Sequence, residues 1–139
     1  MMLSLAVLVP SVSRGDDKAD LAKMQGDWKM SSAKALGKDA PPEFLKSKLN
    51  VKKKTFTLIT TREGMERKRP IEVKIDSSKS PKQIDLIKKD GTTESHGIYK
   101  VEGKKLTLCF TRSSSPRPTK FESSEGDKNF LMIFDRAKK

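Results

Sequence analysis

The sequence predicts an all-β fold: a closed, eight-stranded antiparallel meander barrel, in which each strand pairs with the next along the chain. Three observations favour this fold. From residue 28 onwards, apolar and polar residues alternate in short runs, which is the pattern of strands with one buried face. Glycine-containing turns separate these runs. The connections leave no room for crossover helices, so neighbouring strands are antiparallel, and closure of the meander removes its edges.

The length and composition predict one soluble domain with one core. Of the 139 residues, 34% are hydrophobic and 35% charged, and the apolar residues recur in clusters, which argues against disorder. The formal net charge of +12 attracts phosphates, anionic lipid surfaces and acidic polymers. Because most lysines lie in groups at predicted turns, we favour a solvated surface over a dedicated polyanion site.

The first residues, MMLSLAVLVPSVSRG, are typical of a secretory signal peptide, with an apolar stretch at residues 3–9 followed by Pro10 and small residues. This stretch is too short to span a bilayer, so no transmembrane segment is expected. We therefore predict that residues 1–15 are a signal peptide and that residues 16–139 form the barrel domain of an exported protein, in the periplasm, in the cell envelope or secreted. If the stretch is not a working signal, the protein remains cytoplasmic.

Two short helices are predicted beside the first strand. Residues 16–25, DDKADLAKMQ, have Leu21 and Met24 three apart and acidic residues at the start, so they favour a helix that Gly26 ends. Trp28 and Met30 then alternate with polar residues, which begins the first strand. In the loop that follows, we interpret Asp39 as an N-cap, with two prolines in the first turn of a short helix that carries the FL pair.

Seven further strands are predicted from alternating runs, which read LNVKK, TFTLIT, PIEVKID, KQIDLIKK, ESHGIYKV, KKLTLCF and NFLMIFDR. Pro70 stands at the first position of its strand, where a missing N–H is tolerated. Hairpin turns are predicted at Gly64, Gly91 and Gly103, because glycine accepts the positive φ that tight turns require.

Alternating strand directions assign each connection to one end of the barrel. One end receives the 36–48 loop, the Gly64 and Gly91 turns and the Ser-rich segment TRSSSPRPTKFESSEGDK. The other end receives the Lys53 turn, the 76–82 connection, the Gly103 turn and the N-terminal helix. The first end is therefore predicted to be open and loop-rich, and the second closed. The predicted interior side chains are Trp28, Met30, Phe56, Leu58, Ile71, Val73, Ile75, Ile84, Leu86, Tyr99, Val101, Leu106, Leu108 and Phe110.

The short helix, the tripeptide Gly26-Asp27-Trp28 and the eight-strand meander together resemble the lipocalin architecture. In that superfamily the tryptophan of a Gly-x-Trp motif packs across the closed end, so the resemblance implies barrel closure by Gly26 and Trp28. More specifically, the chain resembles a family of exported lipocalin-like proteins, without an assigned reaction, that is abundant in planctomycete bacteria. The segments that match are LAKMQGDWK, Pro41-Pro42-Glu43, SPKQIDL, GIYKVEGKKLTLCF and SPRPTKFES. The resemblance implies a fold and an export route.

Four residues are candidates for contact with a ligand: Tyr99, Arg112, Arg117 and Lys120. Tyr99 is predicted to face inward, where its hydroxyl either contacts a ligand or, as is more common, finds a partner within the protein. The three basic residues offer an anion clamp at the open rim. The alternative, which we favour, is a rigid extended segment whose Phe121 packs against the barrel.

No catalytic or metal-binding constellation is predicted, and no cofactor. A single cysteine, Cys109, excludes an intrachain disulfide and a Cys-rich zinc site, and His96 is the only histidine. His96 is expected on the outer surface near the open rim, without a partner motif for catalysis. Cys109 is expected to face outward as a small packing residue rather than a reactive thiol. No specific nucleic-acid motif is present.

We therefore predict a non-enzymatic, exported, lipocalin-like protein that takes a small apolar or amphiphilic anion into the barrel through the open rim. The alternative is a basic interaction module that binds acidic polymers or the cell-envelope surface, with a filled barrel as scaffold; its binding would fall steeply with salt. An enzyme would require His96 inside a cleft beside a carboxylate. We expect a monomer.

Overall fold

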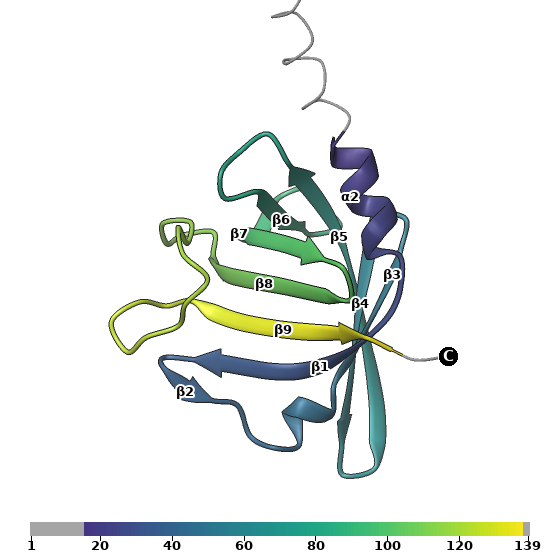
Figure 1. The fold of residues 1–139 in the computed structure, drawn as a ribbon. Helices are drawn as coiled ribbons and strands as arrows, with labels where there is room; N and C mark the ends of the chain where they lie inside the picture. The colour runs from purple at the N-terminus through teal and green to yellow at the C-terminus, as the bar shows by residue number, and fades with distance from the viewer. Residues whose placement is uncertain (1–15, 138–139) are drawn as a thin grey trace, which may run out of the picture.

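The computed structural model describes residues 16–137, which form an antiparallel β-barrel with an α-helix across one end (Figure 1). The predicted signal peptide, residues 1–15, lies outside the described residues. Within the described part of the chain, no helix has both the length and the apolar character that are needed to cross a membrane.

Eight strands make up the barrel, and they follow one another around it in chain order. They are β1 (Gly26–Ala35), β3 (Lys48–Lys52), β4 (Thr55–Arg62), β5 (Met65–Asp76), β6 (Gln83–Ile87), β7 (Thr93–Glu102), β8 (Lys105–Arg112) and β9 (Phe130–Arg136). Each strand pairs antiparallel with the next, and β9 pairs with β1 to close the barrel. An additional strand of two residues, β2 (Lys38–Asp39), pairs with β1. The predicted closed meander barrel is therefore confirmed.

Two hairpin turns have the same backbone conformation but different sequence signals. Glu63 and Gly64 join β4 to β5 with φ angles of 53° and 77°, and both must be positive in the turn type that suits two-residue hairpins. Leu36 and Gly37 join β1 to β2 in the same way, with φ angles of 54° and 76°. The first turn was predicted. The second was not, because leucine is rarely found at positive φ.

Both predicted helices are present, but the second begins differently from the expectation. The N-terminal helix α2 covers Asp16–Met24. The helix in the loop after β1 is one turn of 3-10 helix, η1 (Phe44–Lys46), and its N-cap position is held by Glu43 without a side-chain hydrogen bond. The predicted N-cap at Asp39 is wrong, because the Leu36-Gly37 turn places Asp39 in β2, opposite Lys34 of β1.

The core is formed by inward side chains of the barrel strands, closed at one end by α2. Every predicted interior residue belongs to this cluster, either buried or partly buried against it. Residues that were not among the predicted interior set also belong to it: Met24, Ala33, Leu49, Val51, Met132 and Phe134. Ala33 was missed because a β-bulge between Met30 and Ser32 shifts the alternation of β1 by one residue.

The closed end of the barrel is packed around Trp28. Its side chain is fully buried, and its Nε1 donates a hydrogen bond of 2.8 Å to the Met24 carbonyl at the end of α2. The Arg136 guanidinium lies over the indole, 4.1 Å from the ring centroid, and also donates to the Gln25 carbonyl. Gly26 has a φ of 111°, and a Cβ there would lie 3.1 Å from Arg136. The chain thus turns at Gly26 directly from the helix into the first strand.

Candidate ligand-binding site

A pocket of about 880 Å³ lies at the loop-rich end of the barrel, the end opposite α2. It is bounded by the β1–β2 hairpin, the η1 segment, the tip of the β4–β5 hairpin and the first residue of β9. Its volume is within the range of small-molecule sites, about 300–1,000 Å³. The predicted open rim is therefore the end that carries a pocket.

One wall of this rim pocket is apolar and continuous with the core. Phe44 of η1 and Phe130 of β9 have ring centroids 5.8 Å apart, with planes inclined by 36°. Both rings, together with Ala40, are partly buried against the hydrophobic core. Phe130 is held in place by pairing with Ala35 of β1 and with Phe110 of β8. Two aromatic rings, one from η1 and one from β9, therefore connect the hydrophobic core to the rim pocket.

The end of the β4–β5 hairpin also lines the rim pocket, and it contributes two arginines. Side chains alternate along a strand, so Thr60 and Arg62 follow the inward residues Phe56 and Leu58 on the same face of β4. Arg67 of β5 is paired with Thr60 and shares this face. Both arginines line the rim pocket.

The rim pocket is lined by equal numbers of basic and acidic side chains. Lys38 adds a third cation to the two arginines, while the acidic side chains that also line the pocket are Asp39, Glu43 and Glu63. The ion pairs found among residues 16–137 involve none of these side chains. None of the side-chain hydrogen bonds found among residues 16–137 involves the guanidinium group of Arg62 or Arg67, and both side chains are exposed to solvent.

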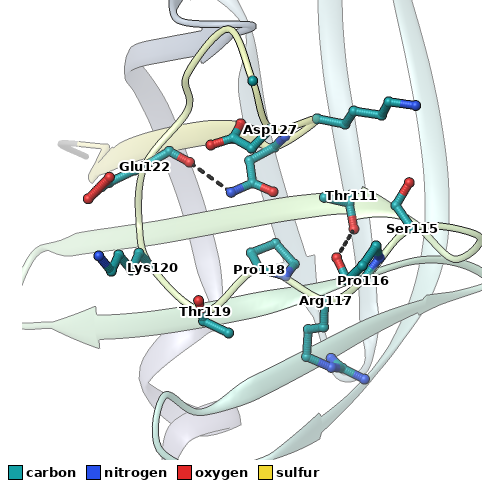
Figure 2. A pocket seen from close by; sticks show the side chains of 12 residues that line it. Thr111, Ser115, Pro116, Arg117, Pro118, Thr119, Lys120, Glu122 and Asp127 are labelled. Atoms are coloured by element: carbon teal, nitrogen blue, oxygen red, sulfur yellow. Dashed lines mark hydrogen bonds between the residues drawn. The ribbon is translucent and has the colours of Figure 1, made fainter.

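The Ser-rich segment, residues 113–129, does not line the rim pocket. It folds back over the outer face of β6, β7 and β8, as Figure 2 shows for its first part. Arg117 donates to the Gly97 carbonyl at 2.8 Å, and its Nη2 lies 2.9 Å from Asp85 Oδ1 in an ion pair. The predicted position of Arg117 at the open rim is therefore wrong. Its guanidinium is used to fasten the segment to the barrel wall.

Arg112 and Lys120 are both exposed, and the structure does not bring them together with Arg117 into one anion clamp. Arg112 ends β8, where it is paired with Ser95. Lys120 lies on the Ser-rich segment and lines a separate groove of about 490 Å³, formed largely by that segment (Figure 2). Whether either residue binds a ligand stays a prediction.

The Ser-rich segment covers apolar side chains on the outside of the barrel. Ile98 and Cys109 are neighbours in the β7–β8 ladder, point away from the interior, and are buried all the same. The Cys109 thiol lies 3.5 Å from the Glu122 carbonyl, and burial raises its pKa to about 11. Phe121 lies under the Lys100 ammonium, 4.9 Å from ring centroid to Nζ. The Ser-rich segment therefore packs against the barrel, as expected.

His96 lies on the same outer face of the barrel and also contacts the Ser-rich segment. Its Nε2 is 2.5 Å from the Ser115 carbonyl, so this nitrogen donates the hydrogen bond. The outward orientation expected for His96 and Cys109 is found, and neither residue lines the rim pocket.

Tyr99 points inward but contributes to the closed end, not to the rim pocket. Its hydroxyl donates to Asp20 Oδ2 of α2 at 2.7 Å, and the same oxygen accepts from Lys82 Nζ at 2.9 Å. Asp20 is only 3% exposed. Burial, together with the hydrogen bond to Asp20, raises the pKa of Tyr99 above its ordinary value. The Tyr99 hydroxyl therefore helps to hold α2 on the barrel.

The residues that the sequence reasoning missed are Phe44, Phe130, Arg62 and Arg67. A signal for the two arginines was present. Counting outward from the Glu63-Gly64 turn pairs Arg67 with Thr60, and the alternation from Phe56 extends to Arg62. The two rings could not be paired in the same way, because they are 86 positions apart in a chain whose closure register is set by β1 and β9.

Among residues 16–137, no group of three or more His, Cys, Asp or Glu side chains is placed to hold a metal ion. No protein family, curated protein or solved structure matches this chain. The fold and the site define the class of the protein: an antiparallel eight-stranded β-barrel, closed by a helix at one end and with a pocket at the other.

Proposed function

We propose that the protein is a non-enzymatic binding protein that holds a small amphiphilic anion in the rim pocket. The observation that carries this proposal is the pairing of two walls of opposite chemistry. Phe44 and Phe130 offer apolar surface that is continuous with the core, and Arg62 and Arg67 bring two guanidinium groups to the same pocket. An aliphatic or aromatic body fits the first wall. A carboxylate, sulfonate or phosphate group fits the planar guanidinium fork of the two arginines.

The acidic side chains of the pocket narrow the ligand class. A ligand with several negative charges would meet Asp39, Glu43 and Glu63 as well as the arginines. A neutral lipid would leave the guanidinium groups without a partner. A single anionic group on an apolar body is therefore the chemistry that the lining favours.

We further propose that the protein is lipocalin-like and exported. The closed meander barrel, the Gly26-Asp27-Trp28 turn into the first strand and the apolar stretch at residues 3–9 support this. The resemblance implies only the fold and the export route; ligand entry at the loop-rich end is proposed from the strand directions and from the position of the rim pocket.

The positions of His96 and Cys109 support a binding role rather than catalysis. These side chains are the ones best suited to proton transfer or nucleophilic attack, and both lie on the outer face of the barrel beneath or beside the Ser-rich segment. With its pKa raised to about 11, the thiol stays protonated at neutral pH, whereas nucleophilic attack requires the thiolate.

Isothermal titration with a matched pair of ligands, dodecanoate and dodecanol, tests the proposal. Both have the same alkyl chain, so the ratio of their affinities measures the contribution of the anionic group. We expect one dodecanoate per protein, bound about fivefold more tightly than dodecanol, since an ion pair with an exposed arginine contributes at most about 1 kcal/mol. Arg67→Gln should remove most of this preference.

Arg112→Gln is the matched control, because it removes the same charge from an exposed arginine that does not line the pocket. It should leave the preference for dodecanoate unchanged. Equal losses in the two variants would mean that only the overall charge attracts the anion. Absence of saturable binding by either ligand would contradict the proposal outright.

A further inference from the structure

The rim pocket reaches only the ends of the barrel strands. Ala35 is the last residue of β1, Phe130 is the first residue of β9, and residues 60–62 end β4. Arg67 of β5 is paired with Thr60 and therefore lies at the same level. Among the described residues, no inward side chain from deeper in the barrel lines this pocket.

A layer of inward side chains lies directly beneath the pocket, two residues further along each strand, which is a distance of about 7 Å. Met132 stands two residues after Phe130, and its β1 partner Ala33 stands two residues before Ala35. Phe110 of β8 is paired with Phe130 and belongs to the same core cluster. We call Ala33, Phe110 and Met132 the floor of the pocket. Their side chains are 2%, 6% and 9% exposed, respectively.

The side chains deeper than the floor are sealed from water as well. Leu108, the β8 partner of Met132, is 2% exposed, and Leu106 and Phe134 are fully buried. On the β4 side, Leu58 is partly buried against the same core. A side chain that borders an open cavity keeps accessible surface, and the residues of β8 and β9 keep almost none. The rim pocket therefore ends at the floor and does not continue into the barrel.

The apolar surface inside the rim pocket comes from five residues near the rim, which are Ala35, Ala40, Pro41, Phe44 and Phe130. The two phenylalanine rings, 5.8 Å apart, are its largest members, and a flat apolar body can pack on them. A long alkyl chain would outrun this surface. It would then continue into water or push against the floor, where a close-packed core leaves no room for it.

We infer that the ligand has a compact apolar body, which rests on the proposed function because the same pocket is concerned. The body is a ring system or a short chain that lies across the rim against Phe44 and Phe130. It does not thread the barrel, because Met132 and its neighbours in the floor close the way. Met132 thus determines how much of an apolar body the pocket accepts.

Titration calorimetry with straight-chain alkanoates, from hexanoate to tetradecanoate, tests this limit. A fully buried CH₂ group raises affinity about fourfold, so the short members should gain with each added carbon. The gain should then cease, and tetradecanoate should bind within about threefold of decanoate. A chain that entered the barrel would gain more than about 100-fold over the same step.

The outcomes separate this inference from the proposed function. A rise that continues to tetradecanoate, with dodecanoate still preferred over dodecanol, would overturn the compact body and leave anion binding intact. A plateau without preference for dodecanoate would support the closed floor and contradict the anion.

Met132→Ala and Met24→Ala form a matched pair of variants. Both remove the same side chain from the core, but Met24 is fully buried at the closed end. Met132→Ala should open the floor, so that tetradecanoate binds about tenfold more tightly than decanoate, whereas Met24→Ala should keep the plateau. An unchanged plateau in Met132→Ala would overturn the assignment of the floor to Met132. The wild-type series decides the main point even if both variants fail to fold.

Discussion

Trp28 offers the sharpest test of how the barrel is closed. Its side chain is fully buried, its Nε1 is bonded to the Met24 carbonyl, and the Arg136 guanidinium stacks on its ring. Truncation of a buried tryptophan to alanine removes the apolar contacts and leaves a cavity, which costs about 3–5 kcal/mol. The lost hydrogen bond and cation–π contact place Trp28→Ala near the upper end of that range, at about 4–5 kcal/mol.

Urea unfolding followed by far-ultraviolet circular dichroism measures this loss, since the intrinsic fluorescence of the only tryptophan disappears with the substitution. Stabilities of small domains are about 5–15 kcal/mol, so the alanine variant is close to unfolding. Trp28→Phe keeps an aromatic ring but leaves the Met24 carbonyl without its donor, and we expect it to lose about 2 kcal/mol. A loss below about 1 kcal/mol for Trp28→Ala would refute the role of Trp28 in closing the barrel.

Two further predictions concern side chains that the structure has buried against other elements. The folded protein holds the proton of Tyr99 more tightly than the unfolded chain does, so ionisation of the unfolded chain above about pH 10 favours unfolding. Melting temperatures measured from about pH 8 to about pH 11, a range that brackets the ordinary tyrosine pKa, should therefore fall more steeply with pH for the wild type than for Tyr99→Phe. The Cys109 thiol should react slowly with a disulfide reagent at about neutral pH. Arg117→Ala should accelerate that reaction about tenfold, because it releases the Ser-rich segment that covers the thiol, whereas Lys120→Ala should leave the rate unchanged. Equal rates in these two variants would show that Arg117 does not hold the segment over the thiol.

The barrel was predictable because its local signals agree with its topology. Period-two alternation places Ile71, Val73 and Ile75 inward, and glycines such as Gly64 mark the turns, so the antiparallel order follows from short connections. The β1–β2 hairpin was not predictable from the same signals. Its first turn residue is Leu36, which violates the usual preference for glycine or asparagine at positive φ.

The location of the candidate site was predicted only in part. The loop-rich end was identified correctly from strand directions, and the pocket is there. Arg117 was misplaced because strand directions say at which end a connection starts, not where a long segment then packs. A signal for its return over the wall lay in the outward positions of β7 and β8, where Ile98 and Cys109 are apolar and require a cover.

Binding of an amphiphilic anion in the rim pocket is tested most directly by mapping bound dodecanoate with nuclear magnetic resonance. With backbone and side-chain resonances assigned, titration should shift the signals of Phe44, Thr60, Arg67 and Phe130, which line that pocket, and should leave those of the Ser-rich segment, residues 113–129, largely unchanged. Shifts centred on that segment, or shifts that do not saturate at any residue, would contradict the claim that this barrel binds an amphiphilic anion at its loop-rich end.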